Sequence, residues 1–312
     1  MCLAFDKVKQ LNTRKSWLLA AVESLNKDAI AHATDNTSRL DAEVMLCKAA
    51  GISRTELFTH PEAPLSNSEI DTLSDMLSKR LAGMPVAYIV GQREFWSFEL
   101  EVNEHVLIPR PDTETLVSAA LERLPSNKQD TLLELGTGSG AIAIALASEC
   151  KHPIIATDIS VEALAVAKRN AVRHVPGRIS FVLSDWLTAF KSSAGASAGA
   201  SATPTASTTT NSSRIAMVIS NPPYLATDDE HLAALQYEPQ GALVTEDKGL
   251  RDIQTIIRDC SGILATGGYL LLEHGMEQGK SVRDLFTQHG YTSIETVYDL
   301  ATRERVTLGR TQ

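Results

Sequence analysis

The chain has 312 residues, a formal net charge of −9 at pH 7 and an ordinary apolar fraction of 43%. This length is sufficient for two domains, each with a buried core. The acidic balance disfavours broad, non-specific binding to nucleic-acid phosphates. No apolar run approaches the roughly 20 residues of a membrane-spanning helix, and the first residues lack the apolar core of a secretory signal. We therefore expect a globular cytoplasmic protein.

The four cysteines are scattered along the chain and form neither a C-x-x-C pair nor a metal-ligand spacing; they are Cys2, Cys47, Cys150 and Cys260. Four cysteines could form two disulfides, but in a large chain without a secretory signal they usually stay reduced. We expect structural cysteines and no metal site.

Helical patterns occupy the N-terminal part of the chain. Ser53 and Ser66 each begin a Ser-x-x-Glu sequence, the pattern of a capping box at a helix start. Gly51 follows one apolar segment at the place of a C-terminal cap, and Pro85 closes the last segment. The segments are 16–25, 39–50 and a run in which Ile70, Leu73, Leu77 and Leu81 recur at helical spacing. Residues 1–85 are predicted to form a small helical domain.

The next segment, 86–108, is predicted to be a linking β-hairpin. Residues that favour strands are frequent from Ala87 to Ile108 and include the aromatic Phe95 and Trp96. We expect this hairpin to connect the helical domain to the rest of the chain.

Helix and strand patterns alternate in the remainder, 109–312, as they do in a parallel sheet with helical crossovers. The last two predicted strands, 291–298 and 303–310, are separated by only a few residues. So short a connection implies an antiparallel pair. The predicted fold class is α/β, with a Rossmann-like sheet that ends in an antiparallel pair.

A glycine-rich turn interrupts this pattern after the apolar strand 132–135. The turn consists of Gly136, Thr137, Gly138, Ser139 and Gly140, and a buried helical pattern follows it. Glycine allows positive φ and lets a ligand approach the backbone closely. The N–H groups at the start of the following helix attract negative charge, here a carboxylate.

An acidic residue, Asp158, ends the next predicted strand, about 20 positions after the glycine turn. An acid at this place usually binds the hydroxyl groups of a ribose. The glycine spacing is G-x-G-x-G rather than G-x-G-x-x-G, and no arginine follows to accept a 2′-phosphate. These features favour an adenosine ligand without a pyrophosphate over NAD.

Residues 191–213 consist almost entirely of Ser, Ala, Thr and Gly and contain no aromatic residue, Leu, Ile or Val. Such a segment cannot bury enough apolar surface to offset its ordering entropy, so we expect a flexible loop. Because long surface insertions cost little stability, we interpret it as a tolerated insertion. The alternative is a gating or docking element, since its ends are expected near the ligand crevice.

The sequence Asn221-Pro222-Pro223-Tyr224 follows the apolar strand 215–220. Proline cannot donate to a sheet ladder, so strand pairing must stop there. The Asn221 side-chain oxygen and the nearby backbone carbonyls then offer hydrogen-bond acceptors, and the Tyr224 ring offers a flat apolar face. This arrangement suits a planar NH2 group. In an open α/β sheet, ligands bind outside the carboxyl ends of the strands, where all three motifs are expected to meet.

Together, the glycine turn, Asp158 and Asn221–Tyr224 resemble a class I S-adenosylmethionine-dependent methyltransferase that modifies an amino or amide nitrogen. Two further stretches, 93–96 (Arg-Glu-Phe-Trp) and 107–114 (Leu-Ile-Pro-Arg-Pro-Asp-Thr-Glu), resemble those of the release factor glutamine methyltransferases, the HemK/PrmC family. Ribosomal-protein glutamine methyltransferases share Asn-Pro-Pro-Tyr but usually carry Arg-Ser-Pro where this chain has Arg110-Pro111-Asp112. The likeness extends from about residue 40 to the C-terminus.

The resemblance implies a seven-stranded class I methyltransferase domain and an enzyme that methylates N5 of the glutamine in the Gly-Gly-Gln motif of class I peptide-chain release factors. It implies that the glycine turn lines the methionine part of S-adenosylmethionine, that Asp158 holds the ribose, and that Asp185 and Trp186 flank the adenine. The reacting amide would be bound by Asn221, Pro222, Pro223 and Tyr224, with Asn221 also next to the cofactor. Arg110, Thr113 and Glu114 would border the cofactor. The helical domain would dock the release factor.

Three alternatives remain open. Adenine N6 or guanine N2 presents the same planar NH2 group, so a nucleic-acid amino methyltransferase is one. Its usual basic recognition region is missing, because charges of both signs are mixed in the N-terminal domain; no stable binding of nucleic acid or membrane is expected. A ribosomal-protein glutamine methyltransferase is the second. A non-catalytic cofactor-binding module is the third, and the presence of Asn221 disfavours it.

Overall fold

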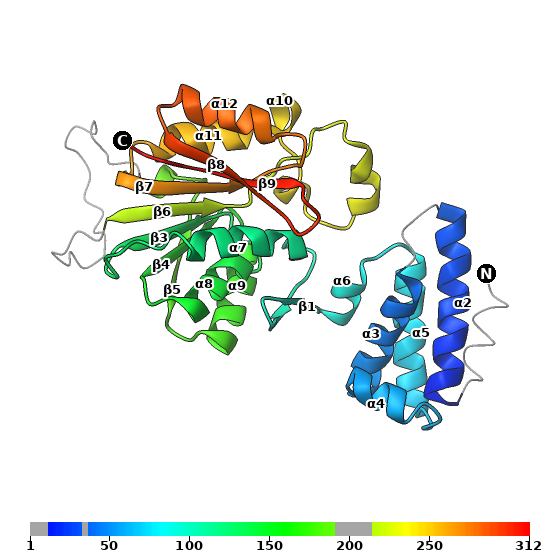
Figure 1. Cartoon of the computed structure of the whole chain (residues 1–312). Coiled ribbons are helices and arrows are strands. Elements are labelled where there is room, and N and C mark those ends of the chain that lie inside the picture. The colour runs from blue at the N-terminus through cyan, green and yellow to red at the C-terminus, as the bar shows by residue number, and fades with distance from the viewer. Residues whose placement is uncertain (1–11, 33–36, 191–213) are drawn as a thin grey trace, which may run out of the picture. The chain divides into compact units, whose positions relative to one another are not determined.

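The computed structural model describes residues 12–32, 37–190 and 214–312, without the side chains of residues 28–32. The chain divides into two compact units, Met1–Gln92 and Arg93–Gln312 (Figure 1). The insertion at 191–213, predicted to be a flexible loop, lies outside the described residues. Within the described ranges, no helix is long and apolar enough to cross a membrane.

The first unit is built from helices, as predicted. They are α2 (Arg14–His32), α3 (Ser38–Ala50), α4 (Arg54–Thr59), α5 (Asn67–Leu81) and α6 (Val86–Val90). The core contains buried side chains from α2, α3 and α5, among them Trp17, Met45, Leu46, Leu73 and Leu77. Burial of each large apolar side chain contributes about 1.5–3 kcal/mol, so this core stabilises the unit.

One of the two predicted capping boxes is complete. At the start of α5, the Ser66 side chain accepts from the Glu69 N–H, and the Glu69 carboxylate accepts from the Ser66 N–H. At the start of α4, Ser53 accepts from the Glu56 N–H at 3.1 Å. The Glu56 carboxylate, however, pairs with Arg14 at 3.2 Å. The charge-assisted bond to a guanidinium replaces the bond back to a backbone N–H.

The predicted linking hairpin is wrong in its first part, because Val86–Val90 forms helix α6 rather than a strand. Pro85 precedes the helix, and its fixed φ suits a helix start. Ala87 and Val90 are buried, and Val90 belongs to the core of the first unit. Burial on one face of a short helix therefore outweighs the strand preference of the valines and isoleucine.

The hairpin itself is shorter than predicted, with strands β1 (Gln92–Phe95) and β2 (Phe98–Glu101). The turn residues Trp96 and Ser97 have φ values of 50° and 65°, as a two-residue type I′ turn requires. This conformation is costly for tryptophan, and two bonds hold it. The Trp96 N–H donates to Glu114 at 3.0 Å, and the indole N–H donates to Glu149 at 3.1 Å.

The second unit contains the predicted seven-stranded sheet, with the order β5-β4-β3-β6-β7-β9-β8. Its strands are β3 (Thr131–Leu135), β4 (Ile154–Asp158), β5 (Ile179–Leu183), β6 (Ile215–Ser220), β7 (Leu264–Glu273), β8 (Thr292–Tyr298) and β9 (Glu304–Arg310). The first five are parallel, whereas β9 is antiparallel to β7 and β8. The expected fold class and the antiparallel final pair are confirmed.

Helices cover both faces of this sheet. One core joins the sheet to α7 (Glu114–Leu121), α8 (Ala141–Glu149) and α9 (Val161–His174). The other joins it to α11 (Arg251–Cys260) and α12 (Gly279–Gln288). Successive residues of β3 belong to opposite cores, Leu132 to the first and Leu133 to the second. The three described cysteines form no disulfide.

Shorter elements lie between these helices and strands. They are the 3₁₀ helices η1 (Pro111–Thr113), η2 (Thr188–Phe190), η3 (Glu230–Leu235) and η4 (Gln240–Ala242), and the single-turn helix α10 (Glu246–Gly249). From β3 the chain proceeds outward to β4 and β5 and then returns to β6 on the other side of β3. The carboxyl ends of β3 and β6 therefore border the switch point where α/β sheets bind ligands.

Candidate active site

The Asn-Pro-Pro-Tyr segment begins directly after β6, at the carboxyl edge of the sheet. Ser220, the last residue of β6, donates its hydroxyl to the Leu135 carbonyl at 2.8 Å, which joins the ends of β6 and β3. Pro222 and Pro223 are buried. The side-chain N–H of Asn221 donates to Thr113 Oγ1 at 3.3 Å. Within the described chain, no hydrogen bond reaches the Pro222 carbonyl.

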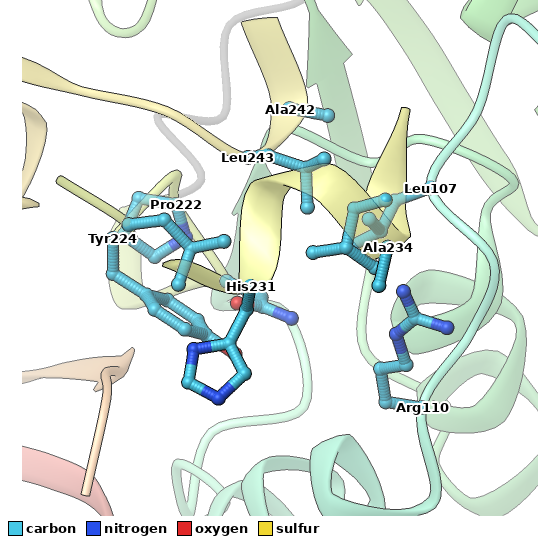
Figure 2. A pocket seen from close by; sticks show the side chains of 11 residues that line it. Leu107, Arg110, Pro222, Tyr224, His231, Ala234, Ala242 and Leu243 are labelled. Carbon is cyan, nitrogen blue, oxygen red and sulfur yellow. The ribbon is translucent and has the colours of Figure 1, made fainter. Parts of the chain in front are cut away.

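A pocket of about 330 Å³ opens beside this segment, and most of its lining is apolar. Figure 2 shows the lining side chains, with Tyr224 and Arg110 on opposite sides of the view. Its lining residues are Leu107, Arg110, Asn221, Pro222, Tyr224, Leu225, His231, Ala234, Leu235, Ala242 and Leu243. The pocket therefore lies between Asn-Pro-Pro-Tyr, the stretch around Arg110 and the segment that follows Tyr224.

The segment between Leu225 and Val244 forms one wall of the pocket. Leu225 and Val244 form an isolated parallel bridge, so the chain leaves the site and returns to it at one place. The Leu225 N–H donates to the Leu243 carbonyl, and the Thr245 N–H donates to the Leu225 carbonyl, both at 3.0 Å. We call residues 226–243 the covering segment.

Arg110 is held in the pocket wall by a buried acid. Its guanidinium pairs with Glu238 at 2.5 Å. The other carboxylate oxygen of Glu238 accepts from the Ile108 N–H at 3.1 Å. Glu238 is only 4% exposed, so little water competes with Arg110 and the Ile108 N–H for its carboxylate. The covering segment thus fixes both the guanidinium and the backbone before η1.

Glu273, the last residue of β7, is buried behind this pocket. Thr113, Tyr224 and Arg305 lie close to its carboxyl. Burial raises the pKa of Glu273 to about 7, although these three neighbours oppose that rise. Burial likewise raises the pKa of Tyr224, whose hydroxyl therefore stays protonated.

Gln278 supports the backbone of the Asn-Pro-Pro-Tyr segment. Its side-chain N–H donates to the Tyr224 carbonyl at 3.0 Å, and its oxygen accepts from the Gly275 N–H at 2.9 Å. Gly249 lies against the same carbonyl, with φ of 80°. A Cβ atom there would be 2.1 Å from the Tyr224 oxygen. Only glycine fits this position without displacing Tyr224.

We predict that Gly249→Ala lowers the free energy of unfolding by about 1–3 kcal/mol through overpacking and left-handed strain, and lowers kcat as well. Gly177→Ala is the matched control, because Gly177 has φ of 73° but no atom within 4 Å of its Cβ position. Denaturant unfolding of both variants separates the loss of stability caused by the contact from the loss caused by backbone strain. Equal losses of stability would show that the contact with Tyr224 contributes nothing.

The glycine turn lies at the carboxyl end of β3 and leads into α8. Gly136, Gly138 and Gly140 all have positive φ, at 71°, 53° and 85°. The Thr137 hydroxyl donates to Glu134 at 2.6 Å, while the other oxygen of Glu134 is buried without a partner among the described residues. Burial raises the pKa of Glu134 to about 8. Ser139 is buried, and its carbonyl accepts from Asn170 at 2.9 Å.

Asp158 ends β4 beside this turn. Its two carboxylate oxygens accept from the N–H groups of Gly138 and Ser160, each at 2.9 Å. Burial raises the pKa of Asp158 above the ordinary aspartate value, and these hydrogen bonds oppose the rise. The glycine turn and Asp158 are therefore in direct contact, as expected from their positions at the ends of neighbouring strands.

Trp186 and Asp185 follow β5 at the same edge of the sheet. The Trp186 ring would lie 3.7 Å from a Cβ atom at Gly136, and its indole N–H donates to Asp252 at 3.1 Å. Trp186 has φ of 42°, so its orientation is maintained against backbone strain. Asp185 is exposed. The structure thus places the Trp186 ring over the glycine turn.

Sequence reasoning missed the supporting residues of this site. Glu273 ends β7 and Gln278 directly precedes α12, and neither was assigned a part in the site. The sequence does hold one sign of Glu273: an apolar strand pattern ends in Glu273-His274, and acids are almost never buried without a partner. The covering segment was missed because its short 3₁₀ turns have no apolar periodicity.

Two histidines of the second unit have structural contacts. His274 is fully buried, and its ring bonds with the Gly275 carbonyl and the Thr307 hydroxyl. The His289 ring bonds with the Leu285 carbonyl. His231 differs, because it lines the pocket while pairing with Asp229 at 2.8 Å.

Each of the two units matches the model of a known protein family. Residues 17–91 match the model of the PrmC N-terminal domain, and residues 126–273 match a methyltransferase domain. Among solved structures, the hMettl16 catalytic domain in complex with MAT2A 3′UTR hairpin 6 shares the fold, with a TM-score of 0.52 and 14% identity over 75% of this chain and 81% of that chain.

Curated relatives are similar over nearly the whole length. The release factor glutamine methyltransferase of Escherichia coli is 40% identical, covering 94% of this chain and 97% of its own. Those of Aliivibrio fischeri and Haemophilus influenzae are each 39% identical, covering 93% and 95% of this chain and 97% and 98% of their own. The chain belongs to the release factor glutamine methyltransferase family.

Proposed function

We propose that this protein transfers a methyl group from S-adenosylmethionine to the side-chain amide nitrogen, N5, of the glutamine in the Gly-Gly-Gln motif of class I peptide-chain release factors. The observation that carries the proposal is the Asn221 carboxamide, whose N–H is bonded to Thr113 while the residue lines a largely apolar pocket directly after β6. Family membership supplies the substrate class.

The residues of the glycine turn fit the proposed cofactor. The helix-start N–H groups of α8 suit its carboxylate, and the unpartnered oxygen of Glu134 suits a donor such as its ammonium group. Asp158 would hold the ribose hydroxyls, with Asp185 and Trp186 beside the adenine. S-adenosylmethionine supplies a methyl group made strongly electrophilic by its sulfonium.

Orientation is the main contribution of the pocket. An amide nitrogen is a poor nucleophile, because its lone pair is delocalised into the carbonyl. Asn221 Oδ1 and the Pro222 carbonyl would accept the two amide hydrogens and hold the nitrogen toward the methyl group. Tyr224 and Pro223 would pack against the planar amide.

Electrostatics also favours the transfer. Two carbonyl oxygens that draw on both N–H bonds stabilise the positive charge that develops on nitrogen, as an oxyanion hole does for negative charge. The N-methylated amide cation that the transfer produces is strongly acidic and releases one N–H proton to water without a dedicated base. The bonded rings of His274 and His289 are therefore not required for the chemistry.

We predict that Asp158→Ala weakens S-adenosylmethionine binding by roughly 10- to 100-fold, because hydrogen bonds to a charged group contribute about 1.5–3 kcal/mol. Turnover at saturating cofactor changes much less. Asp284→Ala, an exposed acid on α12, is the control. Unchanged cofactor affinity by calorimetry would remove Asp158 from the ribose site.

The same site predicts a pH dependence. The carboxylate form of Asp158 accepts from the ribose, and burial raises its pKa. Cofactor affinity should therefore fall as the pH drops through this raised pKa. The fall should begin at a higher pH than it would for an ordinary aspartate. Asp158→Asn should lose that part of the pH profile.

Mass spectrometry of a release factor incubated with this protein and isotope-labelled cofactor tests the proposed function. We expect one labelled methyl group on the glutamine of Gly-Gly-Gln. Transfer to DNA or RNA, or to a ribosomal protein, without transfer to the release factor would overturn the proposal.

A further inference from the structure

Gln278, directly before α12, contacts the chain on both sides of the covering segment. Its side-chain nitrogen donates to the carbonyl of Tyr224, shortly before that segment begins, at 3.0 Å. The same nitrogen donates to the carbonyls of Lys248 and Gly249, shortly after the segment ends, at 3.2 and 3.3 Å. One carboxamide therefore joins the chain that leaves the pocket to the chain that returns to it.

The orientation of this carboxamide is fixed by its partners. Carbonyl oxygens only accept hydrogen bonds, so the nitrogen of Gln278 must face Tyr224, Lys248 and Gly249. The Gly275 N–H only donates, so the side-chain oxygen must face Gly275, from which it accepts at 2.9 Å. A reversed carboxamide would set its oxygen against three oxygens and its NH2 group against an N–H group. The side chain of Gln278 thus has one orientation that satisfies all of these groups.

The chain that returns from the covering segment enters a strained turn. Asp247 and Lys248 have φ values of 55° and 56°, and Gly249 has φ of 80°. Left-handed backbone costs about 1–2 kcal/mol for each residue other than glycine, so such a turn persists only where its surroundings hold it. Two carbonyls of this turn accept from Gln278. The carboxamide is therefore one of the contacts that maintain the turn.

The strained turn is packed against residues of the pocket. A Cβ atom at Gly249 would meet the Tyr224 carbonyl, so the two backbones are in direct contact. The Thr245 N–H, just before the turn, donates to the Leu225 carbonyl at 3.0 Å. Tyr224, Leu225 and Leu243 all line the pocket. A displacement of the turn would consequently displace the pocket wall.

We propose that Gln278 is a positioning residue that sets the shape of the acceptor pocket by holding the two ends of the covering segment together. This inference rests on the proposed function, because the pocket receives an acceptor only if the reacting amide enters it. Gln278 acts from behind the pocket, through Tyr224 and the strained turn. The contact between Gly138 and Asp158 does not involve these residues, so the cofactor side of the site should be unaffected.

Gln278→Met tests the proposal, because it keeps the length of the side chain and removes both hydrogen-bonding groups. We expect kcat/KM for an intact release factor to fall about 3- to 10-fold, on the scale of one hydrogen bond. A short Gly-Gly-Gln peptide should lose the same factor, since it places the same amide in the pocket. Cofactor affinity by calorimetry should stay within about twofold, which also shows that the second unit is folded. Gln288→Met, at the exposed last residue of α12, is the matched control.

Gln278→Glu provides the second arm. It keeps an oxygen that accepts from Gly275 and replaces the NH2 group by a carboxylate oxygen, which faces the three carbonyls. We expect kcat/KM to fall further than in Gln278→Met, because a negative charge beside carbonyl oxygens is repelled. A loss in Gln278→Met without a loss in Gln278→Glu would assign the effect to the bond with Gly275 and overturn the inference. Unchanged kcat/KM in both variants, a loss confined to the intact release factor, or an equal loss of cofactor affinity would overturn it too.

Hydrogen exchange without substrate separates this inference from the proposed function. The N–H groups of Leu225 and Thr245 close the base of the covering segment, each through a bond of 3.0 Å. In both Gln278 variants they should exchange faster than in the parent and in Gln288→Met, while the amides of β3 and β6 keep their protection. Unchanged exchange would overturn the positioning. If the parent fails to methylate a release factor but the exchange rates respond as expected, the proposed function fails and the positioning stands.

Discussion

Asn221→Ala is expected to lower methyl transfer by roughly 10²–10³-fold while cofactor affinity stays within a few-fold. Loss of one preorganised partner of a developing charge costs about 2.7–4 kcal/mol. The Asn221 side chain lines the pocket, and the contacts of the glycine turn with Asp158 do not involve it. Single-turnover rates and calorimetry of cofactor binding measure the two effects separately.

Asn127→Ala is the matched control for this substitution. Asn127 is exposed before β3, and its side chain bonds only with nearby residues of its own turn. The methyl-transfer activity of Asn127→Ala should equal that of the parent. If cofactor affinity collapsed in step with activity in Asn221→Ala, the residue would belong to the cofactor site rather than to the amide site.

The second large effect concerns the size of the substrate. We expect an intact release factor to be methylated far more efficiently than a short peptide that contains Gly-Gly-Gln. One methylene separates glutamine from asparagine, and a pocket distinguishes such a difference by only about 1–3 kcal/mol. Selection of one glutamine in a cell therefore needs a second contact surface. The helical first unit is the element we propose for it.

Comparison of kcat/KM for the two substrates measures this contribution. A chain that begins at Arg93, where the second unit starts, should show a raised KM for the release factor and an unchanged affinity for the cofactor. Unchanged cofactor binding also serves as the check that the second unit remains folded. Equal efficiency on peptide and protein would contradict docking by the first unit.

Most of the fold was predictable because its signals are local. Apolar runs that end in a glycine turn, an acid or two prolines indicated the carboxyl ends of three strands, and these ends are neighbours in the sheet. The short final connection indicated the antiparallel pair. The exception is α6, where four of the five residues prefer strands but form a helix in which Ala87 and Val90 are buried. Such burial depends on distant partners and leaves no local signal.

The site was predictable in part. The predicted part comprises Asn221, the glycine turn and Asp158. Each follows a parallel strand, and the carboxyl ends of parallel strands lie at the same edge of the sheet. Glu273, Gln278 and Glu238 come from later segments, and they reach the site only through the course of the folded chain. Arg110, the partner of Glu238, is 128 residues away in sequence, and Tyr224, a partner of Gln278, is 54 residues away. No periodicity or spacing connects such pairs.

The bridge between Leu225 and Val244 has a consequence for how the family could diversify. Residues 226–243 begin and end at one anchored point, so their length and composition can change without moving the strand ends. The proposed methyl-donor side of the site, at the ends of β3 and β4, would be left unaltered by such changes. Under the proposed function, the wall of the acceptor pocket and the donor site therefore lie on separate parts of the chain. Remodelling residues 226–243 would then change the shape of the pocket and leave the glycine turn and Asp158 as they are.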